Sequence, residues 1–166
     1  MLTASKKVTL RVLIPTVAGG LLLLACGQVA SSPSPRPTPL RATAECNPPS
    51  PSGNFPEERL GTTAGGSLWA YLMPRGGLPV RAGEETKIVW RYTVSHPSHD
   101  PVIRFTARAA DGVQAQMTFG PEGHSGSTWH RPGYEVGTGF IFPAPGCWDI
   151  HAVADGMSGD LFLVVE

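Results

Sequence analysis

Short segments of alternating apolar and polar residues, separated by glycine and proline, constrain the fold of this chain most strongly. Ile88, Trp90, Tyr92 and Val94 share one face of an extended segment, because successive side chains of a strand point to opposite sides. Similar segments predict seven strands, at residues 67–73, 86–94, 102–108, 113–119, 134–142, 147–154 and 160–165. No amphipathic helix is evident, and short strands at this spacing indicate an all-β, antiparallel sandwich.

The clearest local prediction is a β-hairpin. Residues 102–108 and 113–119 both alternate, and Asp111-Gly112 between them is a dipeptide preferred in tight hairpin turns. We therefore expect these two strands to pair with each other.

The sequence also suggests which large or charged side chains are buried. Residues 67–73 carry large apolar side chains on both faces, as a short buried strand does. We expect Trp69, Trp90 and Trp148 in the core. The adjacent acidic pairs Glu57-Glu58 and Glu84-Glu85 lie in expected loops, and we expect them to be solvated.

The N-terminus has the composition of an export signal. Lys6, Lys7 and Arg11 precede an apolar run at residues 12–25, which contains proline and glycine and is short for a membrane-spanning helix. Residues 1–25 are therefore predicted to be a signal peptide.

The end of that run, Leu23-Leu24-Ala25-Cys26-Gly27, resembles the lipobox of bacterial lipoproteins. The resemblance implies diacylglyceryl transfer to the Cys26 thiol, cleavage before this residue and acylation of the new amino terminus. The protein would then be anchored to the bacterial membrane or envelope by lipid, with its domain on the extracytoplasmic side. The alternatives are an uncut signal anchor, or an ordinary secretory signal in which Cys26 is incidental.

Residues 26–44 are rich in proline and serine and have few apolar side chains, so we expect a disordered linker before a folded domain at residues 45–166. Without residues 1–25 the chain has ten basic and thirteen acidic residues, a net charge of −3, and Lys87 is its only lysine. This surface argues against nucleic acid as a partner, because phosphate binding requires clustered basic residues.

Two cysteines remain if Cys26 carries lipid. In an oxidising compartment Cys46 and Cys147 are predicted to form a disulfide that closes a long loop and holds the proline-rich start of the domain. The alternative is two separate buried thiols.

The domain also resembles a group of small bacterial exported proteins and lipoproteins. The resemblance rests on Cys46 followed by prolines, on Gly66-Ser-Leu-Trp69, and on the terminal Phe-Pro-Ala-Pro-Gly-Cys-Trp motif of residues 142–148. It implies an immunoglobulin-like β-sandwich and no established activity. The chain departs from the group at Asp149 and His151, where the group has glutamate and a small polar residue.

Several residues could bind metal, although no cofactor is expected. Cys147, His151 and Met157 have nearly the spacing of a blue-copper loop. The distal ligand would be one of His96, His99, His124 and His130. However, Cys147 and His151 would lie about 13 Å apart along one strand, which one metal cannot bridge.

His96-x-x-His99 with Asp100 is a weak zinc or copper candidate, since it lacks a fourth ligand.

We expect a non-catalytic domain with a recognition or structural role toward an unknown protein or envelope ligand. Trp129, His130 and Arg131 lie in a polar loop, and an exposed tryptophan beside arginine favours ligand binding. The alternatives are a metal-binding or redox domain and an exported hydrolase. For a hydrolase, Gly123-His-Ser125-Gly-Ser127 resembles a nucleophile elbow but ends in serine and lacks the expected helix.

Overall fold

The computed structural model describes residue 46, residues 48–97 and residues 101–166. Every regular element in this part of the chain is a β-strand, and no helix there is long and apolar enough to cross a membrane. The strands are β1 (Glu58–Leu60), β2 (Thr62–Ala64), β3 (Gly66–Pro74), β4 (Glu85–Val94), β5 (Arg104–Ala109), β6 (Gln116–Gly123), β7 (Tyr134–Ile141), β8 (Gly146–Ala154) and β9 (Met157–Val165). The predicted signal peptide at 1–25, Cys26, the linker at 26–44, His99 and Asp100 lie outside the described residues.

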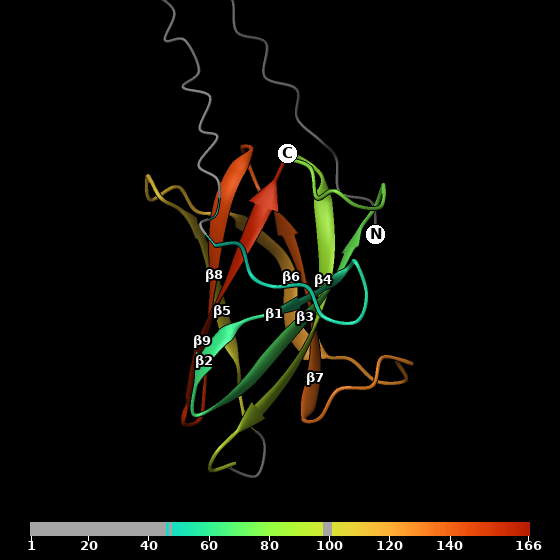
Figure 1. Ribbon diagram of the computed structural model, residues 1–166, viewed down its shortest axis with the longest axis vertical. Coiled ribbons are helices and arrows are strands. Elements are labelled where there is room, and N and C mark those ends of the chain that lie inside the picture. The colour runs from blue at the N-terminus through green and yellow to red at the C-terminus, as the bar shows by residue number, and fades with distance from the viewer. Residues whose placement is uncertain (1–45, 47, 98–100) are drawn as a thin grey trace, which may run out of the picture. The chain divides into compact units, whose positions relative to one another are not determined.

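The strands form two antiparallel sheets, which confirms the predicted β-sandwich (Figure 1). One sheet has the order β1-β3-β4-β7-β6 and the other has the order β2-β9-β8-β5. Strands β3 to β9 reproduce the arrangement of a constant-type immunoglobulin domain, with four strands ordered A-B-E-D facing three ordered C-F-G. The two additional short strands, β1 and β2, each extend one sheet.

The core lies between the sheets and follows the predicted alternation. Ile88, Trp90 and Tyr92 of β4 are fully buried. The Trp90 ring stacks on Phe105 of the opposite sheet with 4.5 Å between ring centroids, and its Nε1–H donates to Thr138 Oγ1 at 2.8 Å. This fully buried tryptophan therefore has its polar atom satisfied.

The predicted hairpin between residues 102–108 and 113–119 forms only beside its turn. Arg108 and Gln114 form an antiparallel bridge, flanked by hydrogen bonds from Ala109 N–H to the Val113 carbonyl and from Ala115 N–H to the Ala107 carbonyl. Beyond this bridge the prediction is wrong, because β5 pairs with β8 and β6 pairs with β7. The chain crosses from one sheet to the other after this turn. Alternation identifies the inward face of a strand but not its sheet, since both inner faces line the same core.

The segment before β1 is held to the four-stranded sheet by the predicted disulfide. Cys46 and Cys147 are bonded, with their Cα atoms 4.9 Å apart and a separation of 101 residues. Ser50 adds two hydrogen bonds to β9: its N–H donates to the Phe162 carbonyl at 3.0 Å, and its Oγ accepts from Phe162 N–H at 2.9 Å. The proline-rich entry segment is thereby fixed at two points.

Replacing both cysteines by alanine, Cys46→Ala with Cys147→Ala, should lower the free energy of unfolding by up to about 4–5 kcal/mol, since a loop of this length is no longer closed in the unfolded chain. Urea unfolding monitored by tryptophan fluorescence measures the loss. Ser50→Ala is the control, because it removes one hydrogen bond of the same segment and should cost only about 1 kcal/mol. Equal stabilities of the double variant and the wild type would contradict a stabilising disulfide.

Candidate binding groove on the five-stranded sheet

The outer face of the five-stranded sheet is covered by residues 124–133, the connection between β6 and β7. The outward-facing side chains of Trp69 and Tyr71, both in β3, contact this segment. Trp69 was predicted in the core, but it lies on the outer face and is only partly buried. Trp90 and Trp148 are in the core as predicted.

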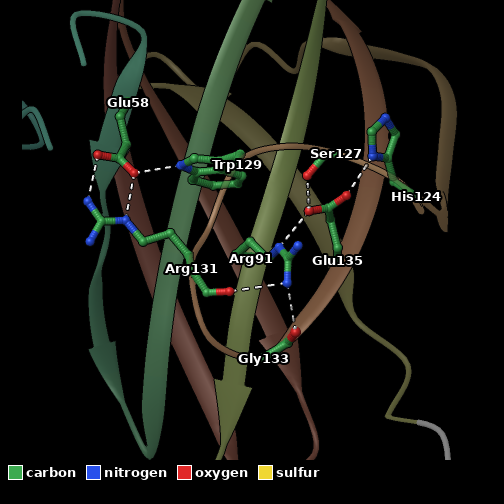
Figure 2. A network of polar contacts seen from close by, with 8 residues as sticks. All are labelled: Glu58, Arg91, His124, Ser127, Trp129, Arg131, Gly133 and Glu135. Carbon is green, nitrogen blue, oxygen red and sulfur yellow. Dashed lines mark hydrogen bonds and ion pairs between the residues drawn. The ribbon is translucent and has the colours of Figure 1, made fainter. Parts of the chain in front are cut away.

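Glu58 of β1 holds one end of the 124–133 segment. Its carboxylate accepts hydrogen bonds from Trp129 Nε1 and from Arg131 Nε and Nη2, all at 2.7 Å (Figure 2). It also accepts one from the backbone N–H of Asn54 at 2.5 Å. The side chain has no exposed surface. The prediction that Glu58 is solvated is therefore wrong: it is a buried anion whose charge is balanced by Arg131.

Arg131 also contacts the sheet beneath it. Its guanidinium carbon lies 3.8 Å from the centroid of the Trp69 ring, within the range of a cation–π contact. Arg131 thus binds a carboxylate with its polar edge and an aromatic ring with its flat face, which fixes both the position and the tilt of the side chain.

Glu135 of β7 holds the other end of the segment. Its carboxylate accepts from Arg91 Nε at 2.5 Å, Ser127 Oγ at 2.6 Å and His124 Nδ1 at 2.7 Å (Figure 2). Arg91 Nη1 donates in addition to the carbonyl of Arg131 at 3.1 Å. Through Arg91, the Glu135 cluster is therefore joined to the backbone of the residue that binds Glu58.

Both carboxylates are stabilised in their ionised form. The hydrogen bond from Arg131, supported by Trp129 and Asn54, lowers the pKa of Glu58 to about 2 although burial opposes the shift. Burial would raise the pKa of Glu135, but the hydrogen bonds from Ser127, His124 and Arg91 outweigh it and lower the pKa. Neither group is therefore suited to donate a proton at neutral pH.

Beside this network lies a groove of about 580 Å³. Its apolar lining consists of Phe55, Tyr71, Met73, Val89 and Trp129. Phe55 and Met73 expose half or nearly half of their surface, at 50% and 46%. The groove thus presents apolar surface to solvent at the boundary between the sheet and the 124–133 segment.

Polar side chains line the groove as well. Lys87 of β4 and His124 are among them, and Lys87 Nζ lies 3.2 Å from His124 Nε2. An ammonium can only donate, so Nε2 accepts, and the imidazole proton is on Nδ1, facing Glu135. Among the described residues, Lys87 forms no ion pair with a carboxylate.

The three residues predicted to form a binding loop are placed differently from one another. Trp129 was expected to be exposed, but only 9% of it is, and its indole and Arg131 both turn inward to Glu58, whereas His130 is exposed. Trp129 still lines the groove with its ring. The sequence reasoning did not identify the other lining residues. The signal that could have indicated part of this lining was the presence of large side chains on both faces of residues 67–73, because one of the two faces had to lie outside the core.

A blue-copper site would need Cys147 as its thiolate ligand, but the sulfur of Cys147 is bonded to Cys46 in the disulfide. Cys147 and His151 lie on the same face of β8, as the sequence predicted, and His151 Nδ1 is 2.5 Å from Asp160 Oδ1. Met157 is buried in the core. His96 is exposed, and in the described part of the chain no three metal-ligating side chains come together.

The candidate nucleophile Ser125 is exposed in the connection between β6 and β7. Strand β6 ends at Gly123, and the residues from His124 to Gly133 form no helix. The strand–turn–helix geometry that exposes the serine of a nucleophile elbow is therefore not formed here.

Comparison of the chain with protein-family models, with curated proteins and with solved structures finds no match.

Glu58→Gln should lower the free energy of unfolding at neutral pH by about 3 kcal/mol. The reason is that the pKa of the Glu58 carboxyl is lowered from 4.5 to about 2 in the folded state, which favours the ionised carboxylate there. Since the folded-state pKa lies below the unfolded value, this contribution is present above pH 4.5 and is lost as the pH falls toward 2. The stability difference between wild type and variant should therefore narrow across that range in urea unfolding experiments. Glu84→Gln, at an exposed glutamate, is the control; a difference that stays constant with pH would contradict the role of Glu58.

Proposed function

We propose that this protein is a lipid-anchored component of the bacterial envelope whose β-sandwich is a non-catalytic recognition domain. The observation that carries the proposal is the groove of about 580 Å³ on the outer face of the five-stranded sheet. Its size falls in the range of small-molecule sites, which are mainly apolar with a few polar groups. Recognition here requires no cofactor.

The cover over the sheet supports binding by a preformed surface. Residues 124–133 have no regular structure, yet Glu58 and Glu135 hold Trp129, Ser127 and Arg131 in place through charge-assisted hydrogen bonds. A wall fixed in this way loses little conformational entropy when a ligand binds. The same contacts argue against catalysis, because both carboxylates are neutralised by arginines rather than poised to transfer protons.

The anchoring part of the proposal rests on the sequence. The apolar run followed by Ala25-Cys26-Gly27 resembles a lipoprotein signal, and residues 26–44 would form the linker that carries the domain away from the membrane surface. Several acyl chains on Cys26 would give lasting attachment, since each buried methylene contributes about 0.8 kcal/mol.

Cys26→Ser should move the protein from the membrane pellet to the soluble extracytoplasmic fraction, because the thiol that receives the lipid is removed. Immunoblotting of fractionated cells measures the distribution. Cys46→Ser is the matched control, since it removes a different cysteine and should leave the protein in the pellet. Unchanged pelleting of Cys26→Ser would contradict the lipid anchor.

Small apolar probes should bind in the groove. Titration of the isotope-labelled mature chain with 2-naphthylmethanol should shift the methyl resonances of Met73 and Val89. Met73→Glu should weaken binding at least about tenfold, because a charge placed against the probe must be desolvated. Val164→Glu is the control at a side chain equally exposed at 46% on the other sheet. If neither this probe nor related apolar fragments shift these resonances, the proposed recognition role is wrong.

A further inference from the structure

We infer that the groove binds a small organic acid, a molecule with an apolar, ring-bearing body and one carboxylate, and that Lys87 holds the carboxylate. This inference rests on the recognition role proposed above and adds the chemical class of the ligand. It follows from the rings that line the groove, from the balance of charge around it and from its position on the sheet.

The apolar part of the groove is built mainly from aromatic rings. Tyr71 lies between Phe55 and Trp129, with centroid distances of 6.4 Å to Phe55 and 5.6 Å to Trp129. The Trp129 N–H is already donated to Glu58, so the ring offers only apolar surface to a ligand. Rings inclined to one another leave faces and edges that suit a flat apolar body, since aromatic pairs prefer offset or edge-to-face contacts.

The charge beside these rings is positive. Arg131 is paired with Glu58 and Arg91 with Glu135, so both carboxylates of the network beside the groove are matched by an arginine. Lys87 has no carboxylate within ion-pair distance among the described residues, and its Nζ contacts the ring of His124. Glu85, the preceding outward-facing residue of β4, is not part of the groove lining.

Lys87 is also able to contact a ligand. Its Nζ has three N–H groups, of which one is directed to His124 Nε2, so two are available for carboxylate oxygens. Hydrogen bonds from an ammonium to a carboxylate are stronger than those between neutral groups. An apolar molecule with a single negative charge therefore matches both halves of the groove.

The position of the groove favours a compact ligand over an extended peptide. The groove lies over β3 and β4, and each of these strands is paired on both sides: β3 with β1 and β4, and β4 with β3 and β7. A peptide that binds as an added strand requires an unpaired sheet edge. Strand pairing therefore cannot recognise the occupant, which must be bound by the residues that line the groove.

The test compares two probes of equal shape, 2-naphthoate and the neutral 2-naphthylmethanol. The protein is the mature chain, residues 26–166 with Cys26→Ser, which retains every described residue and the whole sandwich core. Dissociation constants come from calorimetry, and methyl resonances of Met73 and Val89 locate the bound probe. The wild-type groove should bind the naphthoate about tenfold more tightly than the alcohol, as expected for a partly exposed charge-assisted contact.

Lys87→Met should abolish this preference, because methionine retains the apolar stem without the charge. Lys87→Arg, which keeps the cation, should retain a preference. Arg104→Met removes an exposed cation from the other sheet and should change neither probe. It therefore controls for the net charge of the protein.

The outcomes separate the two proposals. Binding of the alcohol in the groove without a preference for the naphthoate, or a preference that survives in Lys87→Met, would overturn the organic-acid inference while recognition by the groove stands. Absence of both probes from the groove would overturn both. A Lys87→Met variant whose methyl resonances change throughout the core, and not only beside residue 87, would be misfolded, and the comparison of wild type with Lys87→Arg would then decide whether the cation matters.

Discussion

The buried ion pair between Glu58 and Arg131 is the contact on which the outer face of the five-stranded sheet depends. A carboxylate removed from water is costly unless donors surround it, and Glu58 has three side-chain donors and a backbone N–H. All of the side-chain donors come from the 124–133 segment, which has no strand or helix of its own. Removing Glu58 would therefore release the end of the cover that contains Trp129 and Arg131, while Glu135 still holds the other end.

The position of Glu58 depends in turn on the start of the domain. Strand β1 has only three residues, and few of the side chains between Cys46 and Gly61 reach the core. This segment is held instead by the disulfide to Cys147, by Ser50 on β9 and by Glu58 itself. Covalent and electrostatic contacts thus replace the hydrophobic burial that fixes the later strands, and they link both sheets to the entry of the chain.

The sequence predicted those parts of the fold in which the pattern is local. Alternation identified the inward face of β4, and the cysteine count identified the disulfide. The predicted pairing of β5 with β6 was wrong beyond the bridge next to their turn, because the two sheets share one core and a local pattern does not distinguish them. Glu58 was misjudged for a related reason: its partner Trp129 is 71 residues away, and no local pattern shows that a glutamate expected in a loop contacts a distant tryptophan.

The pairing that makes the cover rigid also determines the electrostatic character of the groove. If Arg91 and Arg131 were unpaired, the groove would be strongly basic, and if Glu58 and Glu135 were unpaired it would be acidic. Because each carboxylate is matched by one arginine, the remaining charge is that of Lys87, the only lysine after residue 25. A single uncompensated cation beside an aromatic surface selects for one negative charge on an apolar molecule, whereas a cluster of cations would favour polyanions.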